Sequence, residues 1–219
     1  MHPVADLHRP CKRLMHRRAF LWGASTLGLA ACSGEPVWAP DDAVQRAAFV
    51  GSGPKSLTLY TMKNVGSDNG AHTSLLIDAS QRVMWDPAGT FRASTIPERN
   101  DVLFGMSPRV EQFYVSFHAR ETYYVVGQRI VVSAAVAEQA LRAALAYGAV
   151  PKANCTRATS TILQDLPGFE SIGRTWFPNE LQEDFAKLSG VETQVYRETD
   201  ADDKTTVADA IDAAIRTGQ

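Results

Sequence analysis

Three short, largely apolar segments separated by turn signals constrain the fold of this chain more than any other feature. Residues 57–62 alternate between apolar and polar side chains, and residues 72–77 and 82–86 are equally short. The segments between them, residues 64–70 and 78–81, are rich in Gly, Ser, Asn and Asp. Alternation with a period of two predicts strands, and these intervening segments predict turns. Because the connections are so short, we expect an antiparallel meander.

Beyond this meander the sequence predicts two more strands and then mainly helices. Residues 112–118 and 122–132 are rich in aromatic and β-branched residues, which favour strands. Residues 90–109 contain Pro97 and Pro108 and predict a surface loop. Helices are predicted over residues 134–147, 155–164, 180–188 and 207–216, with a last short strand over residues 192–197. Strands gathered early and helices later favour an α+β fold, in which helices pack on an antiparallel sheet.

The first 31 residues have the layout of an export signal. Arg17 and Arg18 precede an apolar run that ends in Leu-Ala-Ala and Cys32. Residues 19–31 are too few to span a bilayer core, which needs about 20 residues, so a transmembrane anchor is disfavoured. The paired arginines resemble a twin-arginine signal, and Leu-Ala-Ala-Cys resembles the lipobox of bacterial lipoproteins. The resemblance implies cleavage before Cys32 and attachment of lipid to that cysteine.

This resemblance divides the chain into three parts. A signal peptide covers residues 1–31, a tether rich in Pro, Asp and Ala covers residues 32–50, and one domain covers residues 51–219. In Gram-negative lipoproteins, a residue other than Asp after the lipidated cysteine favours the outer membrane, and here that residue is Ser33. The resemblance therefore implies a protein held in the cell envelope by a lipid anchor, in the outer membrane and facing the periplasm.

Charge and composition exclude several classes of partner. Residues 1–32 hold five of the 22 basic and one of the 24 acidic residues, which leaves 17 basic and 23 acidic residues and a net charge of −6. An acidic chain is unsuited to nucleic acid and to a polybasic attachment to membranes. The sequence shows neither metal-ligand spacing nor a complete phosphate-binding loop, so we expect no metal and no cofactor.

Removal of the signal leaves Cys155 as the only free thiol. Cys11 leaves with the signal, and Cys32 would carry lipid. Of the histidines, only His72 and His118 remain. A single thiol in an oxidising compartment is a liability unless it is buried or useful, so Cys155 is either a small core residue or a nucleophile.

Three residues have the placement that a nucleophilic thiol requires. Cys155 follows the predicted helix cap Asn154 and begins its helix, where the helix dipole favours a thiolate. His72 opens a strand after a Gly-rich turn, and Asp86 ends the next strand of the same hairpin. If the turn pairs Ile77 with residue 82 or 83, His72 and Asp86 come near each other, so that Asp86 can orient an imidazole base. Alternatively, His72 is a structural histidine at the strand edge and Asp86 is a turn residue before a proline.

The order His72, Asp86, Cys155 resembles the circularly permuted branch of the papain-like cell-wall hydrolases. This branch includes the permuted NlpC-type thiol hydrolases and the lecithin:retinol acyltransferase-like enzymes. The matching pieces are His-Thr-Ser-Leu-Leu-Ile from His72, Val-Met-Trp-Asp-Pro around Asp86, and Asn-Cys-Thr around Cys155, within residues 55–170. The resemblance implies a permuted papain-like fold and a Cys-His-Asp centre. It also implies an amide or ester substrate, either a cell-wall peptide or a lipid acyl group.

Other candidate residues have weaker roles in this hypothesis. Tyr60 precedes the Gly-rich turn and could face the same cleft, whereas His118 is expected to be structural. The aromatic pair Trp176 and Phe177 is expected in the core rather than as a substrate platform. Two alternatives to an enzyme stay open: a lipoprotein without catalysis that binds a partner or a cell-wall fragment, and an unrelated β-rich lipoprotein in which Cys155 is a core residue.

Overall fold

The structure, a computed structural model, describes residues 34–217, which belong to one compact unit. These residues form six helices and one sheet of seven strands, which confirms the predicted α+β fold. The strands are β1 (Ser56–Asn64), β2 (Gly70–Asp78), β3 (Arg82–Trp85), β4 (Glu98–Arg99), β5 (Val102–Leu103), β6 (Tyr123–Val131) and β7 (Glu192–Tyr196). The helices are α1 (Asp41–Ala47), α2 (Pro108–His118), α3 (Ala134–Tyr147), α4 (Cys155–Gln164), α5 (Pro178–Ala186) and α6 (Lys204–Thr217).

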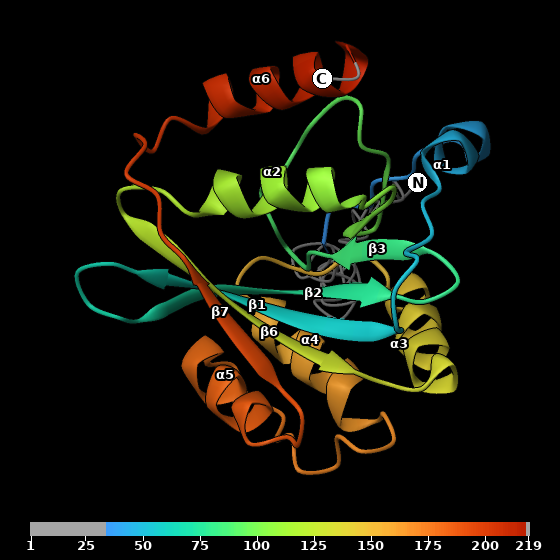
Figure 1. The fold of residues 1–219 in the computed structure, drawn as a ribbon, viewed down its shortest axis with the longest axis vertical. Helices are drawn as coiled ribbons and strands as arrows, with labels where there is room; N and C mark the ends of the chain where they lie inside the picture. The colour runs from blue at the N-terminus through green and yellow to red at the C-terminus, as the bar shows by residue number, and fades with distance from the viewer. Residues whose placement is uncertain (1–33, 218–219) are drawn as a thin grey trace, which may run out of the picture. The chain divides into compact units, whose positions relative to one another are not determined.

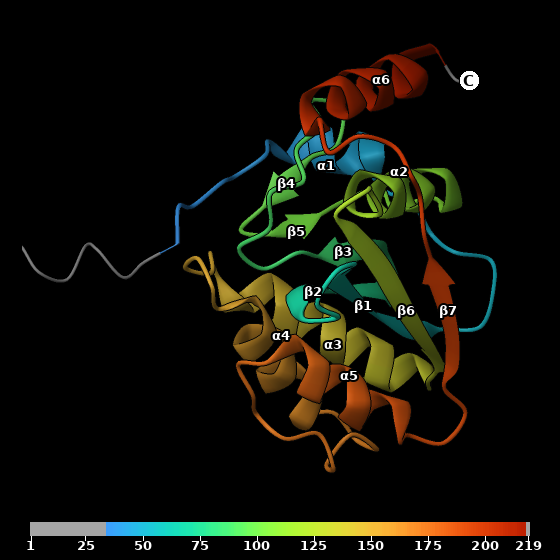
Figure 2. The same ribbon diagram turned by 90° about the vertical axis from the view of Figure 1, so that its left-hand side faces the viewer.

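All paired strands of the sheet are antiparallel, in the order β4-β5-β3-β2-β1-β6-β7 (Figures 1 and 2). The predicted meander forms its centre, because β2 pairs with β1 on one side and with β3 on the other. The short turn after β2 aligns Ile77 with Val83, which is one of the two registers that the sequence allows. This register decides which side chains meet at the end of the hairpin.

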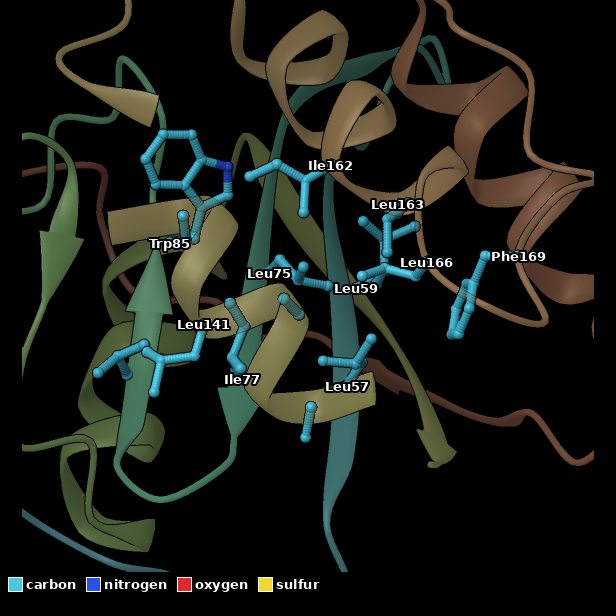
Figure 3. Packing of buried hydrophobic residues seen from close by; sticks show 14 of the residues in the cluster. Leu57, Leu59, Leu75, Ile77, Trp85, Leu141, Ile162, Leu163, Leu166 and Phe169 are labelled. Atoms are coloured by element: carbon cyan, nitrogen blue, oxygen red, sulfur yellow. The ribbon is translucent and has the colours of Figure 1, made fainter. Parts of the chain in front are cut away.

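One face of the sheet packs against α3, α4 and α5 (Figure 2). Alternate side chains of β1 and β2, among them Leu57 and Leu75, point to this face, as the period of a strand requires (Figure 3). Trp85 is the bulkiest fully buried side chain of this cluster, and its ring centroid lies 5.2 Å from that of Tyr147 in α3. This layer fixes α4 against the sheet.

The opposite face of the sheet is covered by α2, and α6 packs on α2 (Figures 1 and 2). The buried side chains on this face include Tyr60 and Met62 of β1, Tyr114 of α2 and Ile211 of α6. The centre of the sheet is therefore buried on both faces, which explains why β1 is covered along nearly all of its length, whereas the edge strand β7 is exposed.

The predicted strand at residues 112–118 is wrong, because this segment lies in the helix α2. The hydroxyl of Ser107 caps the helix, and a proline occupies its first turn, which is a common way for a helix to begin. The buried residues Val110, Tyr114 and Phe117 recur at helical spacing. Burial of this stripe against the sheet outweighs the strand preference of the aromatic residues, which depends strongly on context.

Two of the predicted helices are confirmed at their predicted bounds, as α3 and α4. The side chain of Ser133 accepts a hydrogen bond from the backbone N–H of Val136 at 3.3 Å, which begins α3. Gly148 ends it with a φ of +86°, a conformation in which glycine is strongly favoured.

Residues 34–50, which the sequence assigns to a tether, are partly ordered against the edge of the sheet. They contain the helix α1, and Trp38 forms an isolated bridge with Arg99 of β4. The backbone N–H of Asn100 donates to the carbonyl of Val37 at 2.9 Å. The composition of this segment predicts a linker. It cannot indicate these contacts, because they are made with an edge strand that is distant in the sequence.

The segment 90–109 is not the surface loop that its prolines predict. It contributes β4 and β5, and Phe91 is fully buried. The carboxylate of Asp212 in α6 accepts hydrogen bonds from the backbone N–H groups of Ser94 and Thr95 at 2.8 and 2.9 Å. These bonds tie the segment to the C-terminal helix.

The predicted signal peptide and the lipidation site Cys32 lie outside the described residues, so they stay predictions. Among the helices of residues 34–217, none combines the length and the apolar character that crossing a bilayer requires.

Candidate functional site

A pocket of about 280 Å³ lies where β2, the loop after β3 and the start of α4 meet. His72 and Cys155, two of the three predicted site residues, line it together with His118, Gly89 and Lys204. The third predicted residue, Asp86, is buried beside His72. The structure therefore brings the three predicted residues together at one pocket.

Asp86 holds the imidazole of His72 through a direct hydrogen bond. The Nε2 atom of His72 lies 2.7 Å from Oδ1 of Asp86, and the hydroxyl of Tyr114 donates to the same oxygen at 2.7 Å. The side chain of Asp86 is 1 % exposed and that of His72 is 17 % exposed. A buried carboxylate that accepts two hydrogen bonds has little freedom to move, so it fixes the orientation of the ring.

The strand register explains this contact. Leu75 pairs with Trp85 at the end of the β2–β3 ladder, so continuing the register places Asp86 opposite Ser74. His72 lies two residues beyond Ser74 and therefore on the same face of β2. Diagonal neighbours of this kind on an antiparallel pair are within reach of long side chains. The hairpin thus sets the geometry that the sequence predicts.

Cys155 reaches the site because α4 packs against β2. It is the first residue of α4 and is 8 % exposed. The hydroxyl of Thr73 donates to the hydroxyl of the following residue, Thr156, at 3.2 Å. Since Thr73 is next to His72, this bond fixes the start of α4 beside the imidazole.

The start of α4 lacks the side-chain cap that the sequence predicts. Asn154 occupies the cap position, but its Nδ2 donates to the carbonyl of Lys152 at 3.0 Å instead of capping the helix. The first-turn N–H groups of α4 thus donate no hydrogen bond to this side chain. They contribute the positive end of the helix dipole next to Cys155.

The electrostatics of the three residues favour an ion pair between thiolate and imidazolium. Burial alone would lower the pKa of His72, but the charge and hydrogen bond of Asp86 outweigh it and raise that pKa to about 10. Burial alone would raise the pKa of Cys155, but the interaction with His72 outweighs it and lowers that pKa to about 7. Burial also opposes ionisation of Asp86, yet the charge of His72 holds its pKa below the ordinary value. Between these two pKa values, Cys155 and His72 are both charged.

The hydrogen bond to Asp86 also assigns the roles of the two ring nitrogens. An ionised carboxylate only accepts hydrogen bonds, so Nε2 of His72 carries a proton and donates a hydrogen bond to Asp86. Nδ1 is then the nitrogen of His72 that can exchange a proton with the thiol of Cys155. This arrangement is suited to a general base that acts on a nucleophile.

His118 lies beside this pair but remains uncharged. Its ring is nearly parallel to that of His72, with the centroids 6.1 Å apart and an interplanar angle of 17°. Its Nδ1 donates to the carbonyl of Tyr114 at 2.8 Å, and burial lowers its pKa to about 4. At neutral pH, Nε2 of His118 is therefore a hydrogen-bond acceptor.

Other candidate residues lie elsewhere. Tyr60 does not line the pocket, because its hydroxyl donates to Glu111 and its ring packs 6.3 Å from that of Tyr114. Trp176 and Phe177 are 50 % and 62 % exposed, so the expectation that they lie in the core is wrong.

Two side chains that shape the site are absent from the sequence prediction. Tyr114 donates to Asp86 from α2, and its spacing of four residues from His118 would have indicated one helical face. The strand assignment concealed this relation. Lys204 lines the pocket from the start of α6, and no local pattern in the sequence points to it.

Gly89 leaves the space that the carboxylate of Asp86 occupies. A Cβ at this position would lie 1.9 Å from Oδ2 of Asp86, a separation that two atoms without a bond cannot adopt. We therefore expect Gly89→Ala to displace Asp86 from His72 and to raise the pKa of Cys155, which is about 7, by about one unit. The thiolate fraction at pH 7, and with it the rate of Cys155 alkylation, is then expected to fall by about fivefold. Gly53→Ala is the matched control, because no atom lies within 4 Å of the added Cβ. Equal rates in the two variants would show that Asp86 does not depend on this space.

No group of three or more His, Cys, Asp or Glu side chains in residues 34–217 is arranged to hold a metal ion. Comparisons of the chain with protein-family models, with curated proteins and with solved structures give no match.

Proposed function

We propose that this protein is a cysteine-dependent hydrolase of amide or ester bonds. The supporting observation is the 2.7 Å contact between His72 and Asp86 beside Cys155, in a pocket that both His72 and Cys155 line. A lowered thiol pKa, a positioned base and a group that orients that base are the three requirements of a thiol nucleophile. A core cysteine needs none of these features.

The geometry supports a two-step acyl transfer. The thiolate of Cys155 adds to the carbonyl carbon of the substrate, and the oxygen that becomes negative accepts a hydrogen bond from the backbone N–H of Cys155 at the start of α4. The imidazolium of His72 then protonates the leaving amine or alcohol, and a thioester with Cys155 remains. In the second step His72 removes a proton from water, the hydroxide attacks the thioester, and the acid product and the thiolate are released.

The order of His72, Asp86 and Cys155 along two strands and a helix supports the proposed relation to permuted papain-like enzymes. We extend that proposal to the substrate and to the location of the protein. The substrate is an amide in a cell-wall peptide, with an ester of a lipid acyl group as the second choice. The protein acts in the periplasm and is anchored to the outer membrane through the lipid on Cys32.

Replacement of the thiol tests this function directly. Cys155→Ala is expected to lower hydrolysis of a 4-nitrophenyl ester by at least about 1,000-fold, because the nucleophile is lost. Release of 4-nitrophenolate measures the rate, and covalent labelling with iodoacetamide followed by mass spectrometry shows which cysteine reacts. The rates are measured in the full, unprocessed chain, in which Cys11→Ala removes a different thiol, is the matched control and is expected to keep full activity. Hydrolysis that persists in Cys155→Ala would exclude this mechanism.

A further inference from the structure

Lys204 places a positive charge in the pocket that holds Cys155. It is the first residue of α6, is partly buried and lines the pocket with His72, His118 and Cys155. Its Nζ lies 4.8 Å from the centroid of the Phe117 ring, a contact between a cation and an aromatic face. Within residues 34–217 its ammonium group makes no hydrogen bond and no ion pair.

Two other cationic side chains that are buried, Lys63 and Arg120, each form an ion pair. Lys63 contacts Asp68 at 3.0 Å, and Arg120 contacts Asp200 at 3.3 Å. The two acidic residues that precede Lys204 also have other partners: Asp202 accepts hydrogen bonds from the backbone and the hydroxyl of Thr122, and Asp203 accepts them from the backbone and the hydroxyl of Thr205. The acidic groups near the start of α6 are therefore bound to other partners, and Lys204 keeps its three hydrogen-bond donors for the pocket.

Desolvation of this ammonium has a cost that a bound anion would offset. Burial lowers the pKa of Lys204, although the charges of Asp202 and Asp86 oppose this effect. A charge held in a partly desolvated position attracts an opposite charge more strongly than a solvated surface charge does. His118 is uncharged at neutral pH, so it does not supply a second positive charge at this wall.

We propose that Lys204 determines specificity by binding a carboxylate group on the acyl part of the substrate that Cys155 attacks. The substrate class is an amide or ester whose acyl group carries a free carboxylate close to the scissile carbonyl. The proposal rests on the proposed hydrolase function and further specifies that the substrate carries a negative charge. The pocket, at about 280 Å³, has room for a small acyl group.

Two alkylating reagents of the same size test the charge. Iodoacetate transfers a carboxymethyl group and iodoacetamide a carbamidomethyl group to the thiolate, and both release iodide. Only iodoacetate is negatively charged. Their rates with Cys155 are measured in the full chain that carries Cys11→Ser and Cys32→Ser, so that Cys155 is the only thiol. Lys204→Gln is expected to lower the ratio of the iodoacetate rate to the iodoacetamide rate by about fivefold, as for a partly exposed pair of charges. Lys204→Arg is expected to restore the ratio.

Lys152→Gln is the matched control. Lys152 is exposed and close to Cys155 in the sequence, but it does not line the pocket. The same loss of charge at Lys152 is expected to leave the ratio unchanged. An unchanged ratio in Lys204→Gln, with Cys155 still reactive, would overturn the role of Lys204 and leave the hydrolase proposal intact. A Cys155 that reacts with neither reagent at pH 7 would overturn both.

Discussion

Replacing His72 with alanine is expected to raise the pKa of Cys155 from about 7 to above its ordinary value of 9.0. In the variant, burial of the thiol acts without the opposing charge of the imidazolium. The thiolate fraction at pH 7 then falls from about one half to about one per cent or less, a loss of about 50-fold. The ultraviolet absorbance of the thiolate, followed against pH with Cys155 as the only thiol, measures this change directly.

The sign of both shifts defines the working pH range of the pair. The lowered pKa of Cys155 means that the thiolate forms as the pH rises through about 7. The raised pKa of His72 means that the imidazolium is lost as the pH rises through about 10. Hydrolysis is therefore expected to follow a bell-shaped profile between these values.

His118 supplies the control for this experiment. Because His118 is uncharged at neutral pH, His118→Asn is expected to leave the pKa of Cys155 close to 7. If Cys155 still titrates near pH 7 in His72→Ala, its low pKa is caused by the start of α4 rather than by the imidazole.

Trp85→Ala is expected to lower the free energy of unfolding by about 3–5 kcal/mol, the usual cost of removing a buried aromatic side chain. Trp85 is fully buried between the sheet and α3, so the change leaves a cavity that its neighbours fill only in part. Urea denaturation followed by circular dichroism measures the loss. Trp176→Ala is the matched control with an expected loss below about 1 kcal/mol, because Trp176 is half exposed. Similar losses in both variants would contradict the assigned core.

The central hairpins and the long helices were predictable from local patterns. Alternation marks β1, and the turn residues before and after β2 fix its neighbours in the sheet. Ser133 and Gly148 set the bounds of α3 through their own backbone preferences. The helix α2 was not predicted, because its aromatic residues favour strands in isolation and only packing against the sheet selects the helix.

The candidate site also contains some residues that local patterns predict and others that only tertiary packing brings to it. His72 and Asp86 belong to one hairpin, so the turn alone suggests their contact. Cys155 was found through its place at the start of a helix. Tyr114 and Lys204 come from elements that reach the site only through tertiary packing. The spacing of Tyr114 and His118 indicates a shared helical face, but no local sequence signal points to Lys204.

The hydroxyl contact between Thr73 and Thr156 joins residues 83 positions apart. Contacts across such a long stretch of chain form late, because the intervening loop must first be closed. Until β2 and α4 meet, Cys155 has neither the imidazole nor the ordered helix start beside it, and it titrates like an ordinary cysteine. The chemical reactivity of the thiol is therefore acquired with the native fold, and a growing or unfolded chain carries a largely protonated, slow-reacting cysteine at neutral pH.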